Sequence, residues 1–175
     1  MSFDYITCVE KVLNELPQNP IFLDVGCNIN PIVELGYAEW IENWNDDFTN
    51  IVLDRIPKAK VIGIEPLHWQ KYEEKWNNDD RVFLYKIAFS DENKNETLFF
   101  PNESHVVTSF YIHEVFSDSK ITSYNVNCKT LDSFFDEINL ERIDYLKLDT
   151  EGAEFKILNG SKNLLENKKI KFIQF

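Results

Sequence analysis

The sequence predicts an α/β fold in which helices cover both faces of a parallel sheet. Short apolar runs recur along the chain, and each is followed by a stretch whose apolar residues have helical spacing. Strands that alternate with helices in this way form parallel sheets, because each crossover returns the chain to the same end of the sheet. No linker, repeat or low-complexity tract divides the 175 residues, so we expect a single domain over residues 1–175.

The expected elements begin with an amphipathic helix and a buried strand. Apolar residues follow helical spacing from the start of the chain to Pro17, which places the helix within residues 1–20. Residues 21–25 are apolar on both faces apart from Asp24, as in a parallel strand that is covered on both sides. Pro31 suits the first turn of the next helix.

The rest of the chain continues the alternation. Asp46 and Asp47 can cap a short helix, and Thr130 can cap a later one. Residues 96–128 differ in kind, because they indicate a hairpin or insert around a polar, aromatic stretch. The other strands are expected at residues 61–64, 82–89, 143–148 and 170–175, and the other helices at 69–76, 131–138, 152–158 and 161–166.

The charge of the chain excludes two classes of partner. Thirty acidic residues against 18 basic ones give a formal net charge of −12. A general nucleic-acid binder needs a basic surface that neutralises phosphates, and an anionic lipid surface attracts basic segments. We therefore expect neither a nucleic-acid partner nor a membrane partner.

The compartment follows from the start of the chain and from its cysteines. No basic region followed by an apolar run begins the sequence, and no apolar stretch approaches the roughly 20 residues that span a bilayer. Cys8, Cys27 and Cys128 are odd in number and widely spaced, which fits reduced thiols better than a disulfide framework or a zinc site. We expect a cytoplasmic protein.

Polar residues follow the expected strands at the end of the sheet where open α/β sheets bind ligands. Gly26 allows a tight turn, and Glu65 closes the second strand, where a carboxylate can accept both hydroxyls of a ribose. Asp149, Glu151 and Glu154 repel one another unless a cation or a polar ligand offsets their charge. Each of these residues also has a purely structural interpretation. Gly26 can form an ordinary turn, Glu65 can lie at a helix end, and the three acidic residues can form a solvated turn.

Five blocks of the sequence occur in an order that points to one family. They are FLDVGCN at 22–28, VIGIEP at 61–66, AFSD at 88–91, TLDSF at 130–134 and IDYLKLDTEGAE at 143–154. Together with the later Gly160 they resemble the FkbM family of S-adenosylmethionine-dependent methyltransferases. The K-x-D-x-E-G-x-E pattern at 147–154 is the most specific part, and the resemblance spans roughly residues 21–175.

The resemblance implies a class I methyltransferase fold, S-adenosylmethionine as cofactor and, usually, a hydroxyl of a sugar or small natural product as acceptor. Asp24, Gly26 and Asn28 would line the methionine and ribose part of the cofactor, and Glu65 would hold the ribose hydroxyls. A cofactor without phosphates also suits a site without a glycine-rich cradle. The residues implied at the adenine and at the sulfonium are Ala88, Ser90 and Asp149.

The family fold has seven strands, whereas five main strands are expected here. Either the chain is a fragment of a longer protein, or another element covers the edge of the fifth strand. A homo-oligomer that pairs through this edge is one such arrangement.

Methyl transfer to an oxygen needs alignment of the two reacting atoms and a base for the hydroxyl proton. The candidate bases are Asp149, Glu151 and His105, of which only histidine ordinarily titrates near neutral pH. Asp149, Glu151 and Glu154 are also oxygen donors that suit magnesium or calcium. Strand-end geometry rarely directs three such residues at one ion, so we expect no metal.

Two other functions stay open. A nicotinamide-dependent oxidoreductase can share the acidic end of the second strand, although the lack of a G-x-G-x-x-G motif counts against it. A non-catalytic module can keep the fold, or the cofactor pocket, for assembly with a partner. The acceptor is not named by any spacing rule. Four aromatic residues of the insert suit stacking on a sugar face, although core packing is the commoner role: Phe110, Tyr111, Phe116 and Tyr124.

Overall fold

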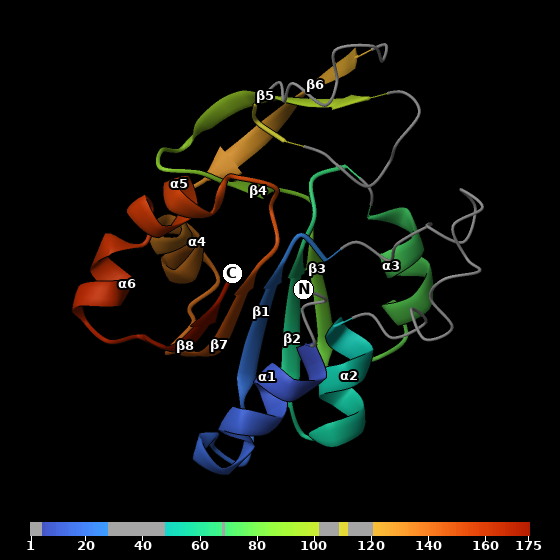
Figure 1. The fold of residues 1–175 in the computed structure, drawn as a ribbon, viewed down its shortest axis with the longest axis vertical. Coiled ribbons are helices and arrows are strands. Elements are labelled where there is room, and N and C mark those ends of the chain that lie inside the picture. Colours follow the sequence, from blue (N-terminus) through green and yellow to red (C-terminus); the bar gives the residue numbers. More distant parts are fainter. Residues whose placement is uncertain (1–4, 28–47, 68, 102–108, 112–120) are drawn as a thin grey trace.

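The structure, a computed structural model, describes residues 5–27, 48–67, 69–101, 109–111 and 121–175. Its centre is a five-stranded parallel sheet with the strand order β3-β2-β1-β7-β8 (Figure 1). The predicted α/β fold is therefore confirmed. The strands of this main sheet are β1 Ile21–Val25, β2 Lys60–Ile64, β3 Val82–Tyr85, β7 Ile143–Leu148 and β8 Ile170–Gln174.

Helices cover both faces of the main sheet, because alternate side chains of each buried strand point to opposite faces. Leu23 and Leu146 belong to an apolar cluster with α4, α5 and α6, whereas Phe22 and Tyr145 pack with α1 and α2. Figure 1 shows the first group of helices at the left and α2 and α3 at the right. The helices are α1 Tyr5–Val12, followed by the 3-10 turn η1 Leu13–Glu15, α2 Phe48–Arg55, α3 Gln70–Trp76, α4 Leu131–Glu137, α5 Glu154–Asn159 and α6 Lys162–Glu166.

The predicted third strand, residues 82–89, is two strands in the structure. β3 ends at Tyr85, which is level with Ile64, the last residue of its partner β2. The pairing of β3 with β2 ends there, and β4 Ala88–Phe89 pairs instead with a strand of a second sheet. The apolar pattern is continuous through both strands, so the sequence shows no break.

The second sheet has three strands and contains the two ends of the predicted insert. β5 Lys94–Pro101 pairs antiparallel with β6 Ile121–Lys129, and β4 pairs parallel with β6. This small sheet lies beyond the end of the main sheet at which β1, β2 and β7 finish (Figure 1). It is therefore a separate layer next to the expected ligand site.

The caps and breaks of the later helices lie where the sequence predicts them. Thr130 precedes α4, and its hydroxyl accepts the N–H of Ser133 at 3.1 Å. Gly160 separates α5 from α6. The helix predicted after Pro31 and the cap predicted at Asp46 and Asp47 lie outside the described residues. Within the described ranges, no helix has both the length and the apolar character needed to cross a membrane.

Candidate functional site

The carboxyl ends of β1, β2 and β7 meet at the centre of the main sheet. β1 lies between β2 and β7, and the chain order of the strands reverses there. Val25, the last residue of β1, is level with the last residues of β2 and of β7. Gly26, Glu65 and Asp149 are the first residues beyond these strands and emerge at the point where such sheets bind ligands.

Gly26 makes the turn after β1 with a φ of +82°. Its N–H donates to the carbonyl of Ile64 at 2.9 Å, while the N–H of Asp149 donates to the carbonyl of Val25 at 3.0 Å. A Cβ atom on Gly26 would lie 2.0 Å from the backbone oxygen of Asp149. The left-handed conformation and the close approach of the two turns therefore both require glycine.

A buried ion pair lies just inside these turns. Asp24 and Lys147 are level with each other in the pairing of β1 with β7. Lys147 Nζ lies 2.9 Å from Asp24 Oδ1 and 3.5 Å from Asp149 Oδ2. Asp24 is 2% exposed and Lys147 4%, whereas the side chain of Asp149 is 47% exposed. Lys147 thus links a buried carboxylate to one at the surface, and this group of three carries a net negative charge.

Glu65 is buried and oriented at the end of β2. Its N–H donates to the carbonyl of Tyr85 at 3.2 Å, and its Oε1 accepts the N–H of Leu67 at 2.9 Å. The carboxylate is thus fixed at the carboxyl end of β2, where the sequence predicts a ribose-binding acid. Its contact with a ribose stays a prediction.

Cys27 packs between the two acidic strand ends. Its Sγ would lie 2.7 Å from a Cβ on Gly63, and the ring of Tyr72 would lie 2.9 Å from the same atom. Burial raises the pKa of the Cys27 thiol well above its usual value, and the negative charges of Asp24 and Glu65 raise it further. The thiol therefore stays protonated, and both carboxylates lie close enough to act on one buried atom.

The turn after β7 exposes two carboxylates and uses a third to hold its own shape. Glu151 and Gly152 are consecutive residues in the left-handed region, with φ of +52° and +101°. Glu154 Oε1 accepts the N–H and the hydroxyl of Thr150, at 3.0 and 2.9 Å. Asp149 and Glu151 are exposed. A non-glycine residue held at positive φ is a strained feature of the kind that clusters at functional sites.

Ala88 and Ser90 lie where the second sheet meets the break between α5 and α6. Ala88 belongs to an apolar cluster of that sheet. The buried Ser90 hydroxyl donates to Glu96 at 2.6 Å, and its N–H donates to the carbonyl of Lys129 at 3.0 Å. A Cβ on Gly160 would lie 2.2 Å from the carbonyl oxygen of Ser90. Both residues thus have structural contacts, and their predicted contact with an adenine stays a prediction.

Asn28 and His105 lie outside the described residues. The predicted cofactor contact of Asn28 and the predicted proton transfer by His105 therefore stay predictions. The same holds for Asp149 and Glu151 as bases, and for the expectation that the site needs no metal.

Glu96 links β5 to helix α5. Its carboxylate accepts hydrogen bonds from Lys156 Nζ at 2.8 Å and from Ser90 at 2.6 Å, and Lys94 Nζ lies 3.1 Å away. Burial alone would raise the pKa of Glu96, but these hydrogen bonds outweigh burial and lower the pKa below its usual value of 4.5.

We expect Glu96→Gln to lower the free energy of unfolding at neutral pH by about 1–3 kcal/mol, because it removes the charge from these hydrogen bonds. The folded-state pKa of Glu96 lies below the unfolded-state value, so this contribution is complete above pH 4.5 and is lost as the pH falls through the folded-state pKa. Urea unfolding of both chains over an acidic pH series measures the difference. Glu92→Gln is the control, since Glu92 is exposed and contacts the same Lys94. A difference that stays constant with pH contradicts the prediction.

Three residues of the site were not assigned from the sequence. A lysine inside an apolar strand is the signal that identifies Lys147, because a buried ammonium requires a carboxylate partner. Gly63 inside a strand indicates a close approach by another group, here Cys27. No pattern relates Ser109 to Glu151, whose carbonyl accepts the Ser109 hydroxyl 42 positions along the chain.

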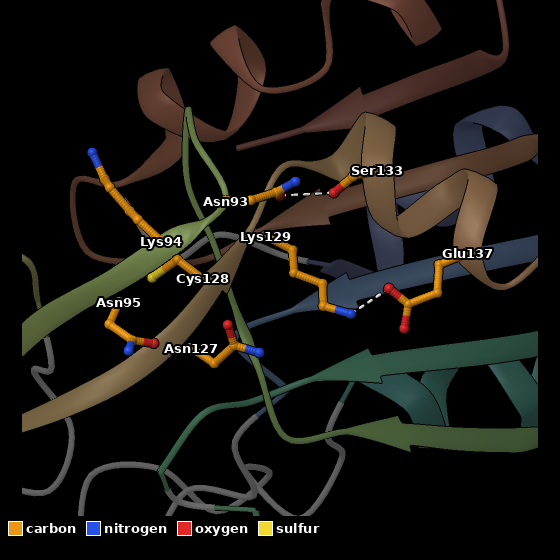
Figure 2. Close-up of a pocket in the computed structure, with 8 residues that line it drawn as sticks. All are labelled: Asn93, Lys94, Asn95, Asn127, Cys128, Lys129, Ser133 and Glu137. Carbon is orange, nitrogen blue, oxygen red and sulfur yellow. Dashed lines mark hydrogen bonds and ion pairs between the residues drawn. The ribbon is translucent and has the colours of Figure 1, made fainter.

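A hollow of about 360 Å³ lies between the β5–β6 hairpin and helix α4 (Figure 2). Figure 2 shows two contacts between its lining residues: the Ser133 hydroxyl donates to Asn93 Oδ1, and Lys129 pairs with Glu137. None of the residues predicted for the cofactor or the acceptor lines this hollow. Its lining is Asn93, Lys94, Asn95, Asn127, Cys128, Lys129, Ser133 and Glu137.

Comparison with known proteins gives one family and one fold. Residues 24–175 match a family model described as a methyltransferase FkbM domain. The AMB antimetabolite synthetase AmbE of Pseudomonas aeruginosa is 24% identical over 180 aligned positions, which cover 83% of this chain and 8% of that protein. The crystal structure of methyltransferase FkbM from Methylobacillus flagellatus KT matches with a TM-score of 0.51 and 12% identity, over 99% of this chain and 44% of that chain. The chain thus spans less than half the length of either relative.

Proposed function

Because this chain belongs to the FkbM methyltransferase family, we propose that it is an S-adenosylmethionine-dependent O-methyltransferase that acts on a hydroxyl of a sugar or small natural product. Membership of the family supports methyltransferase activity. The observation that carries the proposal is the convergence of oriented carboxylates, Glu65 and Asp149, at the end of the sheet where the strand order reverses. The donor and the oxygen acceptor are the parts that require experiment.

The chemistry of the strand-end residues fits this methyl donor. The donor has two ribose hydroxyls and a cationic sulfonium, and it has no phosphate. Glu65 offers a fixed carboxylate that suits the hydroxyls. Asp24 and Asp149 together carry one more charge than Lys147 offsets, and a negatively charged group of this kind suits a cationic sulfonium. The turn at Gly26 is a single tight turn rather than a glycine-rich phosphate cradle.

The chain contributes alignment and a proton acceptor to the reaction. When bound, the donor would supply an electrophilic methyl group for the acceptor oxygen, and its sulfur would keep the electron pair of the broken bond. The hydroxyl proton passes to a carboxylate oxygen of Asp149 or Glu151, or to His105. Asp24 and Lys147 hold the strand ends and the Asp149 carboxylate in register. Alignment of this kind can supply about 7–11 kcal/mol of the reduction in the barrier.

Calorimetric titration with S-adenosylhomocysteine and with NAD tests the proposal. We expect S-adenosylhomocysteine to bind and NAD not to bind. Glu65→Gln is expected to weaken the binding of S-adenosylhomocysteine roughly 10- to 100-fold, since hydrogen bonds to a charged group are worth about 1.5–3 kcal/mol. Glu73→Gln is the control, because Glu73 is an exposed carboxylate on α3 that pairs with Lys86. Binding of NAD instead supports an oxidoreductase, and binding of neither supports a non-catalytic module.

We also propose a cytoplasmic location and a homo-oligomer through the edge of β8. The free thiols of Cys8, Cys27 and Cys128 support a reducing compartment. Ile173 and Phe175 are exposed apolar side chains at the β8 edge, which favours pairing with a further strand. A sedimentation-velocity series that finds monomer at every concentration would exclude the oligomer.

A further inference from the structure

A three-residue segment of the insert is fixed against the turn after β7. The backbone of Ser109 pairs with that of Phe99 on β5, at 2.8 and 3.0 Å. Its hydroxyl donates to the carbonyl of Glu151 at 2.8 Å and accepts the N–H of Tyr111 at 3.2 Å. Ser109 is fully buried. These bonds place Tyr111 beside the turn that carries Asp149 and Glu151.

Tyr111 lies beside Gly152 and is 44% exposed. A Cβ on Gly152 would lie 3.7 Å from Tyr111 Cδ2, an ordinary van der Waals contact. Lys156 Nζ, on α5, lies 5.7 Å from the centroid of the Tyr111 ring and 5.0 Å from that of Phe110. The cation therefore attracts both rings toward α5 and restrains their position.

The aromatic residues of the insert, which the sequence does not distinguish as stacking candidates, differ in burial and contacts in the structure. Phe110 is half-buried and packs against the apolar clusters of both sheets. Tyr124 is exposed on β6, where it pairs across the hairpin with Leu98. Phe116 lies outside the described residues. Of the three that the structure describes, only Tyr111 combines an exposed ring with contact to the turn next to Asp149.

The charges around the Tyr111 ring disfavour an anionic acceptor. Lys156 also forms an ion pair with Glu96 at 2.8 Å, which weakens its attraction for an anionic acceptor. The exposed charges on the adjacent turn are the carboxylates of Asp149 and Glu151. Carboxylates accept hydrogen bonds from hydroxyl groups, and the apolar C–H face of a sugar ring suits the face of a phenol ring. A neutral polyhydroxylated ring satisfies both features.

We propose that Tyr111 is the platform on which a neutral carbohydrate ring of the acceptor stacks, with one hydroxyl directed toward Asp149. The proposal rests on the proposed methyl transfer, since it names the acceptor of that same site. Ser109 is the positioning residue that fixes the platform, and Tyr111 determines specificity by contact with the sugar.

Saturation-transfer NMR on the full chain tests the platform without requiring turnover. The probes are a panel of methyl glycosides of neutral hexoses and deoxyhexoses, measured with and without saturating S-adenosylhomocysteine. We expect saturation transfer to the C–H protons of at least one glycoside. This signal should fall roughly fivefold in Tyr111→Ala and should be retained in Tyr111→Phe. Tyr124→Ala, a matched exposed tyrosine, should retain the signal. The affinity for S-adenosylhomocysteine should change less than about twofold in all three variants.

Each other outcome overturns a defined part of the proposal. A signal that persists in Tyr111→Ala, or that is lost equally in Tyr124→Ala, removes Tyr111 as the platform. Transfer to none of the glycosides removes carbohydrate as the acceptor class. If S-adenosylhomocysteine does not bind, the proposed function fails, whereas a Tyr111-dependent glycoside signal measured without it still identifies a carbohydrate site.

Discussion

Gly26→Ala is expected to destabilise the chain by about 2–5 kcal/mol and to abolish binding of S-adenosylhomocysteine. An alanine there must adopt a φ of +82°, and its methyl group would lie 2.0 Å from the backbone oxygen of Asp149. Because a backbone oxygen cannot rotate away, the turns after β1 and β7 must separate. Thermal unfolding measures the loss, at roughly 2–4 °C of Tm for each kcal/mol in a chain of this size.

Two other glycines separate the causes of this effect. Gly152 has a φ of +101°, but among the described residues a Cβ there meets nothing closer than Tyr111 at 3.7 Å, so Gly152→Ala tests the left-handed conformation. Gly160 has an ordinary φ of −78°, but a Cβ there meets the Ser90 carbonyl at 2.2 Å, so Gly160→Ala tests the backbone overlap alone. Gly26→Ala is expected to exceed both. An equal effect in Gly152→Ala would show that the approach of the two turns is unimportant.

Lys147→Met is expected to lower the free energy of unfolding by about 3–5 kcal/mol. The substitution removes the ammonium that lies 2.9 Å from the buried carboxylate of Asp24. An ionised carboxylate is costly to bury without a cation, whereas methionine fills a volume similar to that of lysine. Urea unfolding at neutral pH measures the change. Arg55→Met, which breaks an exposed pair with Glu10, is the control and is expected to cost less than about 1 kcal/mol.

The double variant Asp24→Leu with Lys147→Met separates stability from donor binding. An apolar pair of similar volume often replaces a buried ion pair without loss, so the double variant is expected to recover most of the stability. It should still bind S-adenosylhomocysteine at least about tenfold more weakly than the unsubstituted chain, because it lacks the predicted donor contact of Asp24 and because Asp149 has lost the ammonium that positions it. If the double variant is no more stable than Lys147→Met alone, the unpaired Asp24 carboxylate is not the cause of the destabilisation.

Much of the fold could be predicted because its cause is local. Residues 21–25 and 143–148 are continuous apolar runs, and such runs form strands that are buried on both faces. Thr130 precedes an apolar stripe with helical spacing, and its hydroxyl caps α4 as expected. The break between β3 and β4 could not be predicted in this way, because β3 ends where its partner β2 ends. A strand's length depends on its neighbour as well as on its own residues.

The residues of the candidate site show the same difference between local and tertiary causes. The sequence by itself determined which residues follow the strands, and therefore that Gly26, Glu65 and Asp149 share one end of the sheet. Only the tertiary structure decided their contacts. Lys147 meets Asp24 across 123 positions because β1 and β7 are adjacent and in register. Ser109 reaches Glu151 because the second sheet lies beyond the strand ends. Local spacing decides which element a residue joins, whereas strand order and register decide which side chains meet, and these depend on the packing of the whole chain.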